Sequence, residues 1–379
     1  MSALWTPDFL DNKRQLADPL ADGVLDTLVE KTGKEAAMAL FEELTRNVEL
    51  PIKGRFPEVD EFIQSTTALP SWADPDKIAL ANRFFTDHGP KLLILLYHKS
   101  LPTLYVDAKG AQVLVQTGRL AHDEKTKNVF ARRVAETGQF LLDVMHKGAL
   151  SPNGTGIEAT QKIRLIHASV RSFIPQAHWD ATTLGRPINQ EDLALTLMSF
   201  GALLLEGLDT LEIEYTKEEA EAYIHHWNVI GYFMGVDENL LPASREEADK
   251  LIRIILDRQA ASSEAGIILA NALIDFAKSN IPFERLENTS LYLIRYLIGD
   301  RYAKMLQVIP QEGCIGILVP EVLKKLFNLG ERLENKVNLP MNLFIDEFSK
   351  IATKKMVDYL DGYKNRNFVI PKEFMKAWF

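Results

Sequence analysis

The predicted helix over residues 131–145 (ARRVAETGQFLLDVM) carries acid–base residue types at positions expected to face the core. Apolar side chains such as Phe140 recur there at i, i+3 and i+4 spacing and form its inward stripe. The first turns of the same stripe hold Arg133, Glu136 and Thr137. Burying charged groups is costly unless they are paired or bind something. These three residues are therefore candidate catalytic residues, unless the stripe's first turns reach solvent or Arg133 and Glu136 simply pair.

A second predicted helix, residues 159–174 (ATQKIRLIHASVRSFI), has an apolar core stripe that includes Ile166. Arg164, His167 and Arg171 lie together on its flank. A histidine between two arginines is disfavoured as a cation, and neutral imidazole is the form that binds metals. The two arginines could also pair with carboxylates such as haem propionates. The alternative is an ordinary core histidine beside two surface arginines.

The elements that must position these residues are almost all helical. Apolar residues recur at three- and four-residue spacing along the chain, and alternating β-branched runs are nearly absent. Asn189 is a predicted N-cap, with Asp192 three residues on, and Ser244 is another, with Glu247 completing a capping box. The apolar stretch 193–205 is too short to span a bilayer and is typical of a buried helix. The stretch GCIGILVP at 313–320 fits either a short strand or the start of a buried helix.

Composition excludes several classes of protein. The 379 residues carry a formal net charge of −9, with 46% hydrophobic and 25% charged residues, as in an average soluble globular protein. The acidic balance argues against nucleic acid as a main partner. A single cysteine excludes an internal disulfide framework, and phosphate-binding loops, dinucleotide fingerprints and nucleophile elbows are absent. No signal peptide or transmembrane segment is visible, so we expect a cytoplasmic protein, either monomer or homodimer.

The RLIHASVR helix, with its Arg–x–x–His–x–x–x–Arg spacing, resembles the signature of the DUF2236 group. That group contains the latex clearing proteins (rubber oxygenases) and the MpaB-like oxygenases. Further stretches are similar to the family in the same order, and with the signature they cover roughly half of the chain. They are LPSWADPDKIALANRFFTDHG, SLPTLYVDAKGAQVLVQTGRL, RVAETGQFLLDVM, YIHHWNVIGYFMGV and REEADKLIRIILDRQ.

The resemblance implies an all-α fold with a globin-like core that holds one haem b, flanked by additional N- and C-terminal helices. It implies that His167 is the proximal iron ligand. The distal Arg–x–x–Lys–Thr motif of the rubber oxygenases corresponds to Arg133, Glu136 and Thr137. Glu136 stands where those enzymes have lysine, and we take it as the candidate base. We expect an N-terminal extension over residues 1–60, a haem-binding core over 61–245 and a C-terminal helical region over 246–379.

The function expected from this resemblance is a haem b-dependent oxygenase. It would use O₂ to cleave or oxygenate a small apolar substrate such as an isoprenoid. Arg133 and Thr137 could stabilise negative charge that develops on oxygen. Two alternatives stay open: a haem-binding sensor or carrier without turnover, and a non-haem helical scaffold. In the scaffold, Arg164, His167, Arg171 and Glu136 would form a buried ion network.

Overall fold

The computed structural model describes residues 5–46, 53–116, 127–152, 154–174, 179–280 and 289–309. Within these ranges every regular element is a helix, and one isolated bridge joins Asp107 to Ala260. The all-α prediction is therefore confirmed. In chain order the elements are α1 Pro7–Arg14, α2 Pro19–Thr32, α3 Lys34–Arg46, α4 Pro57–Ser65, α5 Pro75–Leu95, the π-helical turn η1 Leu96–Ser100, α6 Leu101–Tyr105, α7 Gly110–Gln116, α8 Lys127–Met145, α9 Thr155–Phe173, α10 Ala181–Leu184, α11 Gln190–Phe200, α12 Ala202–Thr210, α13 Lys217–Phe233, the 3₁₀ turn η3 Glu238–Leu240, α14 Arg245–Gln259, α15 Glu264–Asn280 and α16 Thr289–Met305.

The two helix starts predicted from capping residues are confirmed, with one difference. The Asn189 side chain accepts a hydrogen bond of 3.0 Å from the backbone N–H of Asp192 and caps α11. Ser244 caps α14 in the same way, accepting from the N–H of Glu247 at 3.2 Å. The Glu247 carboxylate accepts from the backbone N–H of Ala243 instead of that of Ser244. The capping box predicted here is therefore formed in only one direction.

A large hydrophobic cluster fills the middle of the molecule, and helices α5 and α13 pack against each other inside it. There Phe84 meets Tyr223 edge-on with ring centroids 5.1 Å apart, and Phe200 stacks on Trp227 at 5.0 Å. The cluster draws residues from all three predicted regions of the chain, from Trp5 to Val308. The boundaries at residues 60 and 245 stay a prediction.

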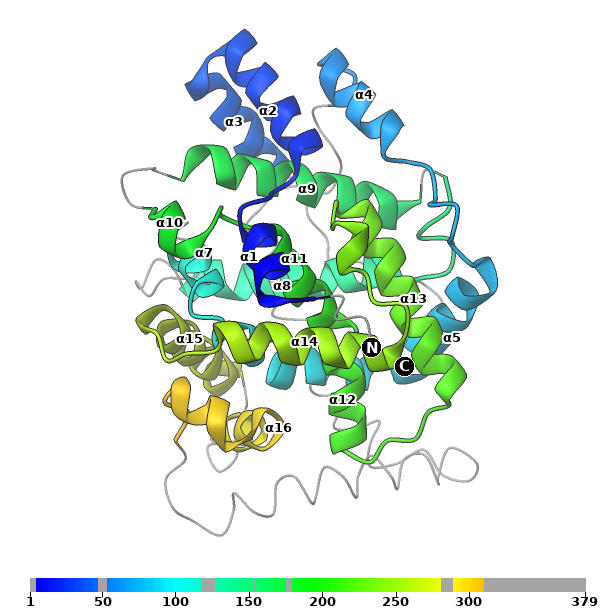
Figure 1. Cartoon of the computed structure of the whole chain (residues 1–379), viewed down its shortest axis with the longest axis vertical. Helices are drawn as coiled ribbons and strands as arrows, with labels where there is room; N and C mark the ends of the chain where they lie inside the picture. The colour runs from blue at the N-terminus through cyan, green and yellow to red at the C-terminus, as the bar shows by residue number, and fades with distance from the viewer. Residues whose placement is uncertain are drawn as a thin grey trace.

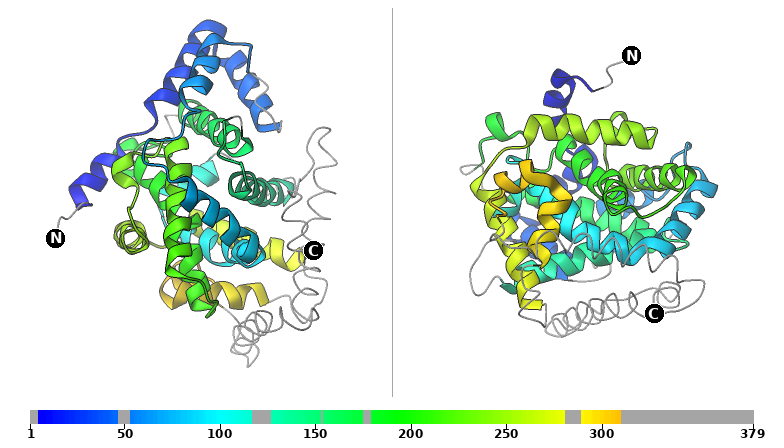
Figure 2. Two further views of the ribbon diagram at one scale, coloured as in Figure 1. Left: turned by 90° about the vertical axis from the view of Figure 1, so that its right-hand side faces the viewer. Right: turned by 90° about the horizontal axis from the view of Figure 1, so that it is seen from below.

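Helices α2, α3 and α4 form a second layer over α9, at the top of Figure 1 and of the left view of Figure 2. Their apolar side chains make a separate cluster with one face of α9. This layer decides which face of α9 is buried. The cluster's buried members are Ala21, Val24, Leu25, Leu28, Leu40, Phe41, Leu44, Val59 and Phe62 of the layer, and Leu165 and Ala168 of α9.

The apolar stretch 193–205 is buried as predicted, but it is divided between two helices. Gly201, with φ −88° and ψ −90°, separates the end of α11 from the start of α12. By length and composition alone, Gln190–Thr210 could cross a membrane. In the structure 78% of its apolar window is buried inside the molecule, and this burial accounts for the composition.

Some predicted features lie outside the described residues. They are the strand or helix at 313–320, the single cysteine, Cys314, and the part of the predicted C-terminal helical region that follows residue 309.

Candidate functional site

Helices α8 and α9 follow each other in the chain and lie side by side (Figures 1 and 2). On α8, Arg133, Glu136 and Thr137 are all half-buried. The Arg133 guanidinium lies 3.6 Å from the Glu136 carboxylate, so the pairing considered from the sequence does form. The Thr137 hydroxyl donates to the backbone carbonyl of Arg133 at 2.8 Å. The structure therefore places the three candidate catalytic residues together on one half-exposed stripe.

On α9, His167 is half-buried and shares its face with Ile163, Ile166 and Val170, which are also half-buried. Neither Ile163 nor Ile166 belongs to a hydrophobic cluster among the described residues. The sequence assigned this face to the core, which holds for Ile174 and Val170 near the end of α9 but not for Ile163 and Ile166. The fully buried face is instead the opposite one, with Leu165, because the α2–α4 layer covers it.

The two arginines that flank His167 in the sequence are buried, not surface residues. Arg164 donates from Nε and Nη2 to the two carboxylate oxygens of Asp18, at 2.7 and 2.8 Å. Arg171 donates from Nε to Asp22 at 2.7 Å. Both guanidinium groups are thus paired with aspartates of the chain itself. Their expected contact with cofactor carboxylates and the four-residue ion network of the scaffold alternative both stay predictions.

The carboxyl end of α8 is held by two buried side chains from other helices. Asn82 of α5 donates to the carbonyl oxygen of Met145 at 2.8 Å. The His226 ring lies 2.9 Å from the carbonyl oxygen of Val144, so its Nε2 carries the proton and donates. Burial lowers the pKa of His226 to about 4 and keeps it neutral. Of the neighbouring histidines 225 and 226, His226 is fully buried and His225 is half-buried.

One acidic side chain on α8 has a shifted pKa. Burial raises the pKa of Asp143 to about 6, although Gln139 donates a hydrogen bond of 2.7 Å to its carboxylate. Asp143 lies near the carboxyl end of α8, two turns beyond Glu136, and sequence reasoning did not single it out.

The residues on α8 and α9 fit a haem group. His167 offers an imidazole, and the aliphatic side chains of Ile163 and Ile166 on the same face suit a flat apolar macrocycle. Arg133 and Thr137 supply polar groups on the neighbouring helix. An imidazole with aliphatic neighbours on its own helix and polar groups on the neighbouring helix is a set of side chains that suits a haem site.

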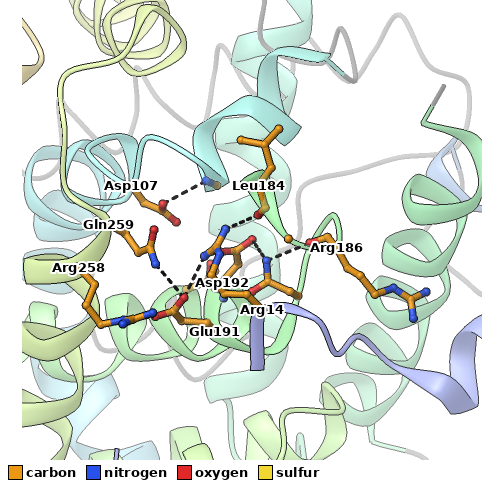
Figure 3. A network of polar contacts seen from close by, with 12 residues as sticks. Arg14, Asp107, Leu184, Arg186, Glu191, Asp192, Arg258 and Gln259 are labelled. Atoms are coloured by element: carbon orange, nitrogen blue, oxygen red, sulfur yellow. Dashed lines mark hydrogen bonds and ion pairs between the residues drawn. The ribbon is translucent and has the colours of Figure 1, made fainter. Parts of the chain in front are cut away.

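A larger ion network joins α1, α11 and α14, and sequence reasoning missed it (Figure 3). Arg14 of α1 donates to Glu191 at 3.0 Å and to Asp192 at 2.8 Å, and Arg258 of α14 donates to Glu191 at 3.1 Å. Burial, with the nearby carboxylate of Asp107, raises the pKa of Asp192 to about 8. In the sequence, Glu191 and Asp192 look like ordinary acidic residues in the first turn of a helix. Only their burial in the folded chain reveals the network.

Comparison with known proteins decides the family. Residues 89–314, more than half of the chain, match the family model described as "ER-bound oxygenase mpaB/B'/Rubber oxygenase, catalytic domain". The chain belongs to this family. The matched region of this mpaB/rubber oxygenase family includes α8 and α9, and it begins after α1–α4.

Two relatives of this family member are informative. A rubber oxygenase from Streptomyces sp. (strain K30) is 27% identical over 262 residues, which are 68% of this chain and 62% of that protein. The match thus spans less than two thirds of the relative. The solved structure of latex clearing protein LCP in the closed state covers 94% of both chains with a TM-score of 0.72 at 22% identity. At that identity the likeness establishes a shared all-helical fold.

Proposed function

We propose that this protein is a haem b-dependent oxygenase that acts on an apolar, isoprenoid-like substrate with O₂. The observation that carries the proposal is the half-buried face of α9, where His167 lies among aliphatic side chains with Arg133, Glu136 and Thr137 on the adjoining helix. Family membership supports the oxygenase class. The name of the Streptomyces relative, rubber oxygenase, supports a polyisoprene-like substrate.

In this proposal the imidazole of His167 would hold the haem. The haem supplies the activation of O₂ when it is bound. Ile163 and Ile166 exclude water on the same face of α9. The rest of the chemistry belongs to side chains on α8.

The α8 residues would stabilise charge and move a proton. The Arg133 guanidinium stabilises negative charge that develops on oxygen. The Thr137 hydroxyl donates its proton to the Arg133 carbonyl, so its oxygen is left only as an acceptor and the stabilisation of negative charge falls to Arg133. The Glu136 carboxylate, 3.6 Å from the Arg133 guanidinium, would accept a proton from an allylic carbon of the substrate.

The test is an absorption spectrum of protein purified after expression with ample haem supply. Wild type is compared with His167→Ala and with His225→Ala, a half-buried histidine on α13 that serves as the matched control. We expect a Soret band in wild type and in His225→Ala, and a lost or shifted band in His167→Ala. A wild type that stays colourless after haem titration overturns the proposal.

Turnover is tested on the haem-loaded protein with a short polyisoprene oligomer. We expect oxygen uptake and carbonyl-bearing cleavage or oxygenation products. Haem binding without oxygen uptake on any apolar olefin would favour the sensor or carrier alternative.

A further inference from the structure

The two arginines of the signature helix are both held by the helix that precedes the matched family region. Asp18 is the N-cap of α2 and Asp22 lies in its first turn, whereas the family match begins at residue 89. Arg164 and Arg171 stand three residues before and four residues after His167. One helix from outside the family region therefore fixes α9 on both sides of the candidate iron ligand.

The Arg164–Asp18 pair is enclosed on every side that the structure describes. Both residues are less than a tenth exposed, and the pair is bidentate. Arg164 also donates to the carbonyl oxygen of Phe233 at 3.3 Å and lies over the Phe62 ring at 5.4 Å. A Cβ on Gly235 would lie 2.8 Å from both groups of the pair, so the backbone of that turn closes over it. Helices α2, α4 and α13 thus meet at one guanidinium.

The Arg171–Asp22 pair is the second point of attachment. The Arg171 side chain is 4% exposed, and its Nη2 lies 2.6 Å from Asp22 Oδ1. Arg171 also donates to the carbonyl oxygen of Ile188 at 3.4 Å. Arg186, half-exposed, reaches the other Asp22 oxygen at 3.4 Å. Asp22 therefore links α2 to α9 and to the segment before α11.

Two attachments about two turns apart fix both the position of α9 along its axis and its rotation about that axis. A rotation by one residue, about 100°, would break both pairs and would turn His167 away from its present face. An imidazole that binds iron must keep its ring orientation, and outer partners commonly provide this.

From this geometry we propose that Asp18 and Asp22 are positioning residues for the cofactor. By pairing with Arg164 and Arg171, they hold α9 so that His167 presents its imidazole to the haem. Helix α2 is then part of the haem-binding machinery. This inference rests on the proposed function, because it presupposes that the cofactor is haem.

The test replaces each acid by the amide of the same shape. Asp18→Asn keeps an N-cap for α2, because asparagine caps as well as aspartate, and removes the charge that faces Arg164. Asp22→Asn does the same for Arg171. Asp26→Asn is the matched control, since Asp26 is exposed on the same helix. Asp22→Glu, which restores the carboxylate, is the conservative rescue.

Three readouts separate positioning from general stability. The first is the rate of haem transfer from each holoprotein to an excess of a high-affinity haem acceptor. The second is the absorption spectrum of the bound haem, which reports its axial ligation. The third is amide hydrogen exchange of α9 compared with α5 and α13 in the haem-free protein.

We expect haem loss to be faster by about tenfold or more in Asp18→Asn and Asp22→Asn, with an altered spectrum and reduced protection confined to α9. Asp26→Asn should match wild type, and Asp22→Glu should recover most of the effect. If both amide variants lose haem at the wild-type rate, this inference is overturned while the proposed function stands. Protection lost equally in α5, α9 and α13 also overturns it, because the acids would then serve only global stability. A wild type that takes up no haem overturns the proposed function itself.

Discussion

At the scale of single residues, Glu136 is expected to matter for turnover but hardly for the stability of the fold. Its ion pair with Arg133 is long and half-exposed, and such pairs contribute less than about 1 kcal/mol. We therefore expect Glu136→Gln to bind haem normally and to change the free energy of unfolding by less than that amount. Turnover should fall about a hundredfold if the carboxylate is the base. Oxygen-uptake rates and thermal melts check this beside Glu30→Gln, an exposed change on α2; equal turnover in both variants would remove Glu136 from the mechanism.

A second residue-scale effect concerns Asp192, whose pKa is raised from 3.8 to about 8 by burial and by neighbouring carboxylates. The folded protein then holds a proton that the unfolded chain releases, so this contribution to stability is complete below the unfolded pKa and is lost as pH rises through the folded pKa. The slope is up to about 1.4 kcal/mol per pH unit for one proton. We expect the free energy of unfolding of wild type to be lower at about pH 8.5 than at about pH 6.5. In Asp192→Asn the difference between the two pH values should be much smaller. An identical slope in the two proteins would show that Asp192 is ionised in the fold.

At the scale of elements, α8 depends on side chains that hold its carboxyl end. The Asn82 amide, buried in α5, donates to the Met145 carbonyl, which the end of the helix leaves without a partner from the next turn. Asn82→Ala leaves that carbonyl unsatisfied and should cost about 1–3 kcal/mol in urea unfolding. Asn12→Ala, at an exposed position of α1, is the control and should change stability by less than about 0.5 kcal/mol. A cost as small as the control's would mean that water satisfies the Met145 carbonyl.

At the scale of the whole molecule, the network in Figure 3 ties the first helix to the core. Arg14 of α1 joins Glu191 and Asp192 of α11, and it also donates to the carbonyl oxygen of Leu184 at 2.6 Å. Removing one partner of a buried pair leaves an uncompensated charge and typically costs 3–5 kcal/mol, so Arg14→Met should destabilise by about that much. Arg55→Met, which breaks an exposed pair with Glu43, should cost less than about 1 kcal/mol in the same denaturant titration.

The sequence alone determined the local features of this protein. Helix periodicity predicted the all-α fold, and capping residues placed the starts of α11 and α14. The order of the motifs identified the family, and the anomalous stripe on α8 was singled out before any geometry was known. The helices and their starts follow from interactions between residues three or four positions apart, which a single sequence displays directly, whereas the family came from the resemblance of its motifs.

Only the tertiary structure decided which groups meet across the chain. Asp18 and Arg164 are 146 residues apart, and Arg14 and Glu191 are 177 apart, so no periodic pattern connects them. The wheel of α9 showed two faces but not how completely each would be covered. Ile174 of the predicted core stripe is buried, whereas Ile166 stays half-buried and the face with Leu165 lies under the α2–α4 layer. Burial and ion pairing depend on the position of every surrounding element, and that position exists only once the chain has folded.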